Sequence, residues 1–314
     1  MTEHSENKEK GHYHPLTLTM LKIGKIFDDL GFEIVDGPHI EDEYHNFDAL
    51  NIPANHPARD MWDTFWIKTR TNNADLTQTK NADNNKPQIH PVKSCEAGIL
   101  PEAKLFNRVN TDKNISINLR KNLRESALLR THTSPVQIRY MEKNKPPIKI
   151  IVPGKIFRYE ATDATHEAQF YQLEGLMITK NTTLATLKGV LKEFLEKFFE
   201  EKIDIRFRPS YFPFVEPGLE VDATCFRCAK ENLSTALKTG KTNPRCSICK
   251  GIGWIEIMGA GMVHPKVLEN CGINPQEWQG FAFGVGIDRL VMLKYGIPDI
   301  RMLYSGDLRL INQF

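Results

Sequence analysis

An arginine and a glutamate lie two residues apart in the run Phe157-Arg158-Tyr159-Glu160. Residues two apart on a β-strand point to the same face, so we expect both side chains to share one face. A guanidinium can fork onto a phosphate or a carboxylate, and the Glu160 carboxylate can accept hydrogens from an amine or an adenine edge. An ordinary ion pair between neighbouring strands is the alternative for this tetrapeptide taken alone.

A second polar pair follows a short loop. The loop Ala161–Gln169 carries His166 beside the basic strand, where it could close over a triphosphate. On the returning strand, Gln172 and Glu174 alternate with bulkier neighbours and therefore face a site together. A polar strand face turned to solvent is the alternative.

Glycines recur at a predicted strand-to-helix turn in the run Gly284-Val285-Gly286-Ile287-Asp288-Arg289. The run lacks both the full G-x-G-x-x-G dinucleotide pattern and the lysine of a P-loop. Glycine still lets the backbone approach a ligand closely, and Arg289 near a helix N-terminus adds a fixed positive charge.

Four of the six cysteines form a C-x2-C…C-x2-C pattern with seventeen residues between the pairs. This spacing lies within the range of four-thiolate zinc sites, so we predict structural Zn²⁺ in a ribbon-like insert over residues 224–253. A redox pair and inert thiols are the alternatives. The predicted ligands are Cys225, Cys228, Cys246 and Cys249, and the basic neighbours that would offset their charge are Arg227, Lys230, Arg245 and Lys250.

Two further cysteines stand alone in the sequence. Cys95 and Cys271 have no paired neighbour, which is typical of small buried hydrophobic side chains rather than of metal ligands.

The first part of the chain predicts one helix followed by loops. Pro15 suits a first helical turn, apolar residues recur at helical spacing up to Leu30, and Gly31 fits the C-cap. Residues 1–13 indicate a solvated polar tail. Residues 36–63 predict loops with short strands, and the polar residues 69–93 predict an exposed flexible loop.

The second part predicts mostly strands. A strand over 148–160 is expected to break at Pro153-Gly154, and Asn181 or Thr182 is expected to cap a helix whose apolar positions extend to Phe198. Mixed strands with few βα alternations favour an α+β fold, an antiparallel sheet flanked by helices. The other predicted elements are strands over 170–179, 205–208, 254–258 and 280–286, and helices from His264 and Ile287.

Bulk composition sets wide limits. The 314 residues suffice for one large domain or two modest ones, and 40% hydrophobic with 25% charged residues is typical of soluble proteins. A net charge of +2 is too small to indicate a nucleic-acid partner by itself. No apolar run approaches the roughly 20 residues of a membrane span, and the polar N-terminus lacks a signal-peptide core. We therefore expect a cytoplasmic protein without a membrane partner.

Taken together, these pieces resemble the second and third sequence motifs of class II aminoacyl-tRNA synthetases. The second motif is an arginine–glutamate strand, a loop and a returning strand, and the third is a glycine-rich strand leading to a helix with an arginine. Longer blocks are similar to the α subunit of bacterial phenylalanyl-tRNA synthetases, from about His14 to Phe314. Those blocks are Asp42–Pro53, His56–Trp66, Leu129–Gln137, Ser210–Pro217, Gly259–Pro265 and Gly280–Gly286.

The resemblance implies a class II catalytic domain over residues 14–314. Such a domain would activate L-phenylalanine with ATP to the adenylate, release pyrophosphate, and transfer the amino acid to the 3′ end of tRNA(Phe). The amino-acid carboxylate would attack the α-phosphorus in line, with no covalent enzyme intermediate.

The resemblance also implies a phenylalanine pocket. A cationic amine needs a carboxylate and neutral acceptors, and the residues matched to the amino group offer both. Phe212 and Phe214, expected to alternate on one strand, match an aromatic wall, with ordinary core as the alternative. Val215 and Ala282 match small floor residues that leave no place for a tyrosine hydroxyl. The residues matched around the amino group are Trp62, His132, Ser134, Gln137, Gln172 and Glu174.

For ATP, the resemblance implies that Arg158 holds the α-phosphate and that His166 and Arg289 hold the β and γ phosphates. Phe170 would stack on adenine and Glu160 would contact its amino group. Mg²⁺ would neutralise the phosphates, and Glu216 matches a Mg²⁺ position at the contact with a second subunit.

The implied assembly is an α2β2 heterotetramer with a larger β subunit and with tRNA(Phe) as substrate. Family α subunits carry an N-terminal helical arm that contacts tRNA, whereas only about 13 polar residues precede His14 here. We expect either a naturally short chain or an absent upstream portion. Many relatives also have a short hairpin in place of the cysteine insert. We expect the insert to stabilise a long connection between two strands.

Two other functions remain open at this point. A catalytically silent relative could bind amino acid or regulate, although intact Arg158, Glu160 and Arg289 argue against it. A zinc-ribbon protein that binds nucleic acid could use the ligase-like parts only as scaffold.

Overall fold

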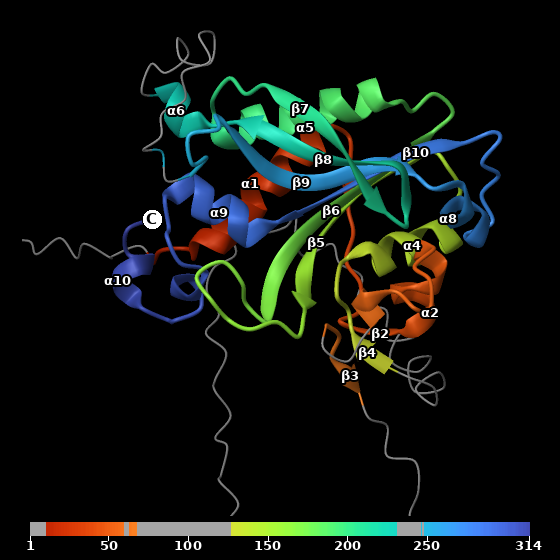
Figure 1. Ribbon diagram of the computed structural model, residues 1–314, viewed down its shortest axis with the longest axis horizontal. Helices are drawn as coiled ribbons and strands as arrows, with labels where there is room; N and C mark the ends of the chain where they lie inside the picture. Colours follow the sequence, from red (N-terminus) through yellow and green to blue (C-terminus); the bar gives the residue numbers. More distant parts are fainter. Residues whose placement is uncertain (1–10, 60–62, 68–126, 231–245, 247) are drawn as a thin grey trace, which may run out of the picture.

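A seven-stranded sheet, in the order β1-β5-β6-β10-β9-β8-β7, runs through the middle of the molecule (Figure 1). The computed structural model describes residues 11–59, 63–67, 127–230, 246 and 248–314. All neighbouring strands are antiparallel except β1, which pairs with β5 in parallel. The predicted α+β fold with an antiparallel sheet is confirmed. The strands are β1 (Glu33–Ile34), β5 (Ile148–Phe157), β6 (Gln169–Thr179), β7 (Ile205–Phe212), β8 (Val215–Thr224), β9 (Trp254–Val263) and β10 (Gln279–Gly286).

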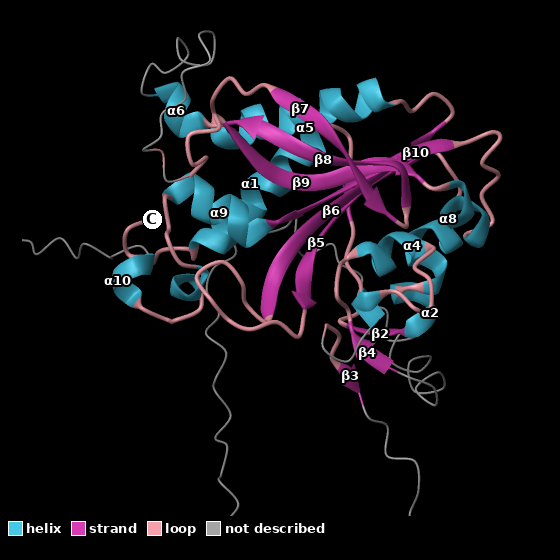
Figure 2. Ribbon diagram, in the orientation of Figure 1, coloured by secondary structure: helices cyan, strands magenta, loops and turns pink. Residues whose placement is uncertain are grey.

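Three helices cover one face of this sheet (Figure 2). They are α1 (Pro15–Asp29), α5 (Leu184–Phe199) and α9 (Ile287–Tyr295). Their apolar sides pack with one set of alternating strand residues into a single buried cluster, and Phe27 of α1 stacks on Phe283 of β10 with ring centroids 5.7 Å apart. The helical spacing of α1 predicted this buried side, and Gly31 follows the helix with φ +76°, as a C-cap glycine does.

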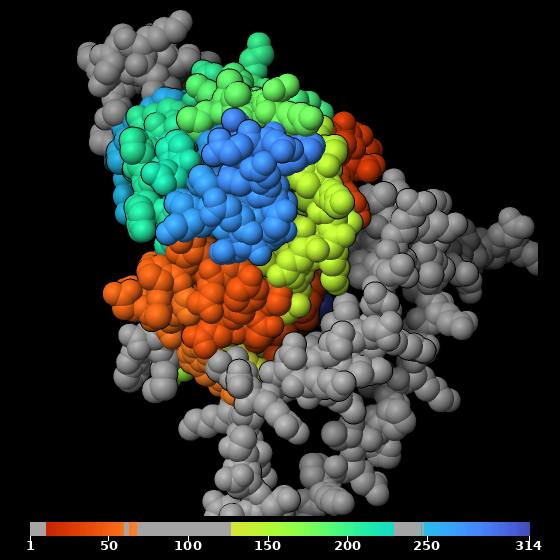
Figure 3. Space-filling model, turned by 90° about the vertical axis from the view of Figure 1, so that its right-hand side faces the viewer, coloured from red at the N-terminus to blue at the C-terminus, as the bar shows by residue number. Residues whose placement is uncertain are grey.

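A second buried cluster lies on the opposite face, at one end of the sheet. It joins α4 (Ser134–Lys143) and α8 (Pro265–Asn270) to the short 3-10 turn η1 (Asp48–Leu50). Segments far apart in sequence meet here: Asn270 Nδ2 donates to the Ala49 carbonyl at 3.1 Å. Figure 3 shows the orange N-terminal segment side by side with the blue segment around α8.

The segment over residues 36–63 contains more regular structure than predicted. It holds the strand β2 (Ile40–Asp42), the helix α2 (Glu43–Asn46), η1 and the 3-10 turn η2 (Pro57–Arg59). The prediction of loops with short strands missed the helical turns, because these are only three or four residues long and stand on tertiary contacts. In a separate three-stranded sheet, β4 (Ala127–Leu129) lies between β2 and β3 (Trp66–Ile67).

The predicted break at Pro153-Gly154 is wrong, because β5 continues through both residues. The Ile151 carbonyl accepts from Val35 on the β1 side at 2.9 Å, and residues two apart point their backbone groups to the same side. Pro153 therefore turns its missing N–H to that side, beyond the end of β1, where no ladder hydrogen bond is required.

Several predicted boundaries also shift. Thr183 caps α5, not Asn181 or Thr182, since its hydroxyl accepts from the Thr186 N–H at 3.2 Å. β7 and β9 extend well beyond 205–208 and 254–258. The remaining described elements are α6 (Phe226–Lys230), the 3-10 turn η4 (Ile300–Leu303) and α10 (Leu308–Ile311).

Some predictions fall outside the described residues. The loop over 69–93, Trp62, Cys95, Arg245 and the Lys230 side chain are in this group, as are residues 1–10 of the predicted tail. Cys271 is described: it is partly buried and packs against the second apolar cluster, as expected of a small hydrophobic side chain.

Candidate functional site

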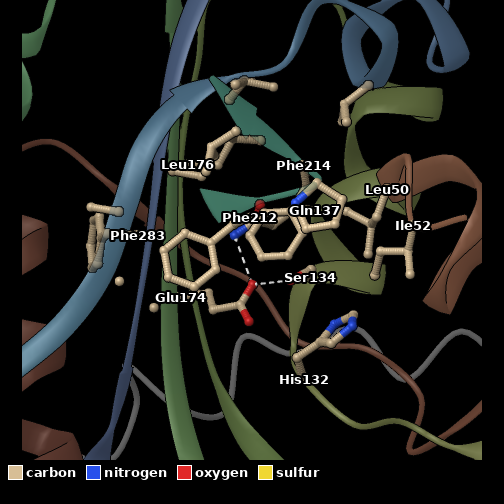
Figure 4. Close-up of a pocket in the computed structure, with 18 of the residues that line it drawn as sticks. Leu50, Ile52, His132, Ser134, Gln137, Glu174, Leu176, Phe212, Phe214 and Phe283 are labelled. Atoms are coloured by element: carbon tan, nitrogen blue, oxygen red, sulfur yellow. Dashed lines mark hydrogen bonds between the residues drawn. The ribbon is translucent and has the colours of Figure 1, made fainter. Parts of the chain in front are cut away.

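A cavity of about 500 Å³ opens on the sheet face opposite α1, α5 and α9. Its volume is typical of small-molecule pockets, which span about 300–1,000 Å³. One end is polar and the other is lined by apolar and aromatic side chains (Figure 4). The lining includes Arg158 and nine of the ten residues matched to the phenylalanine pocket, which are His132, Ser134, Gln137, Gln172, Glu174, Phe212, Phe214, Val215 and Ala282.

The floor of the cavity is formed by small residues at the centre of the sheet. Gly284 of β10 pairs with Glu174 of β6 on one side and with Gly259 of β9 on the other. A Cβ on Gly284 would lie 3.2 Å from Gln172 Nε2, and a Cβ on Gly259 would lie 3.1 Å from Phe212 Cζ. A side chain at either glycine would therefore crowd Gln172 at the polar end or Phe212 in the aromatic wall. Ala282, two residues before Gly284, adds only a methyl group to the same face.

A buried carboxylate marks the polar end. Glu174 Oε2 accepts from Ser134 Oγ at 2.6 Å and from Gln137 Nε2 at 3.2 Å, as Figure 4 shows. Burial raises the pKa of Glu174 to about 7, although hydrogen bonds from Ser134 and the Thr133 backbone and the charges of Arg158 and Arg130 act to lower it. Removing this group from water costs free energy, so an incoming cation would be strongly favoured here.

Unpaired acceptors lie beside this carboxylate. Gln172 Oε1 and both ring nitrogens of His132 are buried without a hydrogen-bond partner among the described residues. Burial, followed by the charges of Arg158 and Arg130, lowers the pKa of His132 to about 3, so its ring is neutral and offers one acceptor nitrogen. Buried polar atoms are normally satisfied, so this group points to a ligand with several N–H or O–H donors.

Two aromatic rings form part of the other end. Phe212 and Phe214 stack with centroids 5.9 Å apart and planes at 23°. The expectation that they alternate on one strand is wrong: β7 ends at Phe212, and Phe214 lies in the turn before β8. Both nevertheless border the cavity, because the two-residue turn brings the second ring back over the first. Apolar side chains from other elements complete this end: Leu50, Ile52, Met141, Leu176, Val263 and Val267.

Arg158 lies at the junction of the cavity with the loop after β5. Its Nε donates to the Thr131 carbonyl at 3.1 Å, and its guanidinium lies 5.2 Å from the centroid of the Phe170 ring. The expectation that Arg158 and Glu160 share a strand face is wrong, since β5 ends at Phe157 and the Glu160 N–H closes a tight turn onto the Arg158 carbonyl at 2.9 Å. Glu160 is exposed as a result.

The other residues matched to ATP lie outside the cavity wall of the described chain. His166 is exposed in its loop, with Nδ1 3.0 Å from Asp163 Oδ2. Arg289 is exposed at the start of α9 and donates through Nη2 to the Glu256 carbonyl at 2.9 Å. Because Glu256 itself lines the cavity, Arg289 lies next to its rim, whereas His166 is engaged within its own loop.

Glu216, matched to a Mg²⁺ position, is exposed at the start of β8. His264 Nε2 lies 3.2 Å from Glu216 Oε2, while His264 Nδ1 accepts from the Lys266 N–H at 3.1 Å. The Nδ1 contact fixes the proton on Nε2, so the ring donates to the carboxylate. The other Glu216 oxygen makes no hydrogen bond or ion pair with the described residues.

The sequence analysis did not predict a cluster of charged side chains beside the cavity. Glu220 and Glu256 line it from β8 and β9, and Arg208 of β7 contacts both, at 2.8 Å and 2.9 Å. Asp222 accepts from the same guanidinium at 2.8 Å. The alternation of Glu220 and Asp222 on one strand could have revealed this polar sheet face.

The four paired cysteines come together as predicted. All are buried, and their sulfur atoms lie within 4.8 Å of one another. Cys225 and Cys246 Sγ are 3.8 Å apart and Cys228 and Cys249 Sγ are 3.5 Å apart, far longer than a disulfide bond. Four sulfurs about 2.3 Å from a common centre in a tetrahedron are about 3.8 Å apart, so the cluster is compatible with zinc.

A second group of potential ligands has a structural explanation. Glu41 is buried and accepts from Arg139 Nε at 3.0 Å, while His45 Nδ1 lies 2.7 Å from Asp42. The first contact joins β2 to α4, and the second lies between α2 and its N-cap residue. The arginine occupies the place that a cation would need, so this group is an ion-pair network. Among the helices of the described residues, none is long and apolar enough to cross a lipid bilayer.

Comparisons with known proteins agree with this site. The family model for the class II tRNA synthetase core domain (F) matches residues 1–314. The chain is 46% identical over 304 residues to the phenylalanine–tRNA ligase alpha subunit of Dehalococcoides mccartyi, covering 97% of this chain and 70% of the relative. The alpha subunit of Clostridium perfringens is also 46% identical, covering 97% and 69%. Pyrrolysyl-tRNA synthetase from Desulfitobacterium hafniense shares the fold, with a TM-score of 0.54 at 14% identity over 93% of this chain and 74% of that one.

Proposed function

This chain belongs to the phenylalanine–tRNA ligase alpha-subunit family of class II tRNA synthetases, and from that premise we propose that its cavity activates L-phenylalanine with ATP. The chain is an aminoacyl-tRNA ligase subunit, and its family places it with a beta subunit and with tRNA as substrate. The proposal adds the residue roles, the α2β2 assembly, the metal ions, the tRNA(Phe) specificity and a cytoplasmic location.

One observation carries the assignment of the amino-group pocket. An ammonium group has three N–H donors and a positive charge. The polar end offers the Glu174 carboxylate, Gln172 Oε1 and one neutral His132 nitrogen, and the latter two are buried without a partner among the described residues. A bound α-amino group would satisfy all three, with Ser134 and Gln137 holding the carboxylate in place. We assign Trp62 to this pocket only through its match to the family.

The aromatic end accounts for the choice of side chain. Phe212 and Phe214 present stacked rings against which a benzyl group would pack edge-to-face or offset, an arrangement worth about 0.5–1.5 kcal/mol beyond area burial. Val215 and Ala282 border the same space. A para-hydroxyl would enter an apolar part of the cavity without a partner, which disfavours tyrosine.

Arg158 would act on the reacting phosphate. It lies in the cavity wall, so a phosphate held by its guanidinium is near the amino-acid carboxylate. The carboxylate would attack the α-phosphorus, the bond to the β-phosphate oxygen would break, and pyrophosphate would leave. The fixed positive charge stabilises the charge that develops on the phosphoryl oxygens. Phe170, beside Arg158, would stack on adenine, with Glu160 at its amino group.

The outer phosphates would lie toward Arg289, at the rim near Glu256. His166 would join them if its loop turns inward from the contact with Asp163. Mg²⁺ would supply charge neutralisation for the phosphates when bound, and Glu216 would hold an ion at the contact with the beta subunit.

Zn²⁺ in the four-cysteine cluster would be structural. Cys225 follows β8 directly, and its N–H donates to the Gly253 carbonyl, just before β9, at 2.9 Å. A bound ion would therefore fasten the ends of two central strands across the insert. The four cysteines belong to the larger buried apolar cluster, which also includes residues of α5. Nearby, the rings of Phe226 and Phe199 stack with centroids 4.9 Å apart.

The decisive experiment is phenylalanine-dependent ATP–pyrophosphate exchange by the chain co-expressed with its matching beta subunit. The expected result is exchange with phenylalanine and far less with tyrosine. Absence of exchange in a correctly assembled complex would overturn the proposal, and RNA binding without exchange would favour the zinc-ribbon alternative. Charging of tRNA(Phe) by the same complex tests the second half-reaction.

A further inference from the structure

The largest fully buried side chain of the described residues is a cation, Arg130. It follows β4 directly and begins the loop that carries His132 to Ser134 at the start of α4. It does not belong to the described cavity lining, so it is not a ligand-contacting group. Burying a charge costs free energy unless the charge is hydrogen-bonded, so the partners of the Arg130 guanidinium decide its role.

The guanidinium of Arg130 joins three separate segments. Nε donates to the Lys155 carbonyl of β5 at 2.8 Å, and Nη1 donates to the carbonyls of Gly37 and Pro38 at 3.0 Å and 3.2 Å. All these acceptors are neutral, and no carboxylate forms an ion pair with Arg130 in the described part of the chain. Its charge is therefore not cancelled at contact distance, and a guanidinium stays protonated.

The backbone has made room for this side chain. A Cβ on Gly154 of β5 would lie 2.3 Å from Arg130 Nη2. Gly154 has no positive φ, so close approach to Arg130 is the reason for glycine here. The main chain of Arg130 adds two bonds, to the His39 carbonyl at 2.9 Å and from the Phe157 N–H at 3.0 Å.

Two arginines, Arg158 and Arg130, thus lie near the amino-group pocket, but only Arg158 lines the cavity. Burial raises the pKa of Glu174 to about 7 and lowers that of His132 to about 3, and Arg158 and Arg130 both act to lower each value. Arg158 borders the cavity, so the charge of a bound phosphate would offset its own. Arg130 is sealed from the cavity and keeps its full effect when ligands bind.

We propose that Arg130 is a positioning residue for the amino-group pocket: it anchors the loop bearing His132 and Ser134 to β5 and to residues 37–38, and it is the permanent positive charge behind Glu174. This inference rests on the proposed function, because it assigns the pocket to the ammonium group of phenylalanine. The polar and charged groups that face Glu174 or share its cavity are Ser134 and Gln137 of α4, His132 and Arg130 of the preceding loop, Gln172 of β6, Arg158 after β5, His56, Tyr211 of β7, and Glu220 and Glu256 of β8 and β9.

The test uses the assembled complex and three variants. Arg130→Met removes the charge, and Arg130→Lys keeps the charge but loses the planar guanidinium. Gly154→Ala replaces no pocket residue: its Cβ would lie 2.3 Å from Arg130 Nη2 and 3.2 Å from Thr133 Cγ2. Misplacement of a binding group by about 1 Å can cost up to about a hundredfold, so we expect KM for phenylalanine to rise by about tenfold or more in each. KM for ATP should stay within about twofold.

A pH profile separates charge from anchoring. Loss of the Arg130 charge favours protonated Glu174, so the acidic limb of kcat/KM for phenylalanine should move to higher pH in Arg130→Met. It should move less in Arg130→Lys and in Gly154→Ala, which keep a positive charge. Calorimetric titration with L-phenylalanine should show the same weakening without ATP present.

Arg139→Met is the matched control, since Arg139 lies on α4 and pairs with Glu41 outside the cavity lining. An equal phenylalanine-specific loss or pH shift in that variant would overturn the proposal, as would parallel losses for ATP and phenylalanine in the Arg130 variants. If the Arg130 substitutions prevent folding, Gly154→Ala decides alone: wild-type KM for phenylalanine refutes the role. Inactive wild-type complex would instead refute the proposed function.

Discussion

Replacing Glu174 by glutamine keeps the shape of the buried side chain and removes its charge. The carboxylate accepts from Ser134 and Gln137 and would also accept from the ammonium group of the substrate. Hydrogen bonds to charged groups contribute about 1.5–3 kcal/mol, and about 1.4 kcal/mol corresponds to a factor of ten. We therefore expect kcat/KM for phenylalanine to fall by about 10- to 150-fold in Glu174→Gln, with KM for ATP little changed.

The same substitution should change how stability depends on pH. The pKa of Glu174 rises from a model-peptide value of 4.5 to about 7 in the folded chain because of burial. The folded state therefore holds this proton more tightly than the unfolded state, and wild-type stability falls as the pH rises from 4.5 through about 7. A shift of this size corresponds to a loss of about 3 kcal/mol of folding stability between low and high pH. Glu174→Gln should not show this loss, because glutamine does not ionise.

Pyrophosphate exchange measures the first effect, and denaturant unfolding at several pH values measures the second. Glu142→Gln is the control, because Glu142 is a half-exposed carboxylate on α4 that lies 3.2 Å from His45, away from the cavity. We expect it to leave kcat/KM for phenylalanine unchanged. Wild-type kcat/KM for phenylalanine in Glu174→Gln would refute the ammonium pocket. Equal pH dependence of unfolding in wild type and variant would refute the buried, proton-retaining carboxylate.

Three other predictions concern separate parts of the molecule. Arg158→Ala should abolish pyrophosphate exchange while leaving subunit assembly intact, and near-normal exchange would contradict its role at the α-phosphate. Ala282→Gly should allow activation of para-substituted phenylalanines, since Ala282 borders the cavity, and unchanged selectivity would place the ring elsewhere. Metal analysis of freshly purified, reduced protein should find about one zinc per chain, and chelation or Cys228→Ser should lower the thermal unfolding temperature. Metal-free protein of wild-type stability would reject the zinc ribbon.

Local sequence signals determined most of the framework. The apolar spacing in residues 15–30 and the glycine at 31 predicted α1 and its end, and the alternation of Gln172 and Glu174 placed both in the cavity wall. The C-x2-C pairs predicted the four-cysteine cluster. In each case the signal works because a fixed period or spacing dictates which side chains share a face or a centre.

Elements that depend on distant partners were not predicted. The turns α2 and η1 are too short to form alone and stand on contacts such as Asn270 with the Ala49 carbonyl. Pro153 indicated a break because a proline normally interrupts a ladder, yet β1 ends before it and leaves that side without a partner strand. Phe214 lies on the cavity through a turn, and no strand period describes a turn.

The identity of the ligand pocket came from residue types and family resemblance, which the sequence already carried. The tertiary structure alone decided which polar atoms lose water. Whether His132 is neutral, whether Glu174 retains its proton near neutral pH, and whether Arg130 is a buried anchor all depend on burial by segments far away in the chain. Sequence fixes which groups can ionise, but their environment in the folded chain determines at what pH they do so.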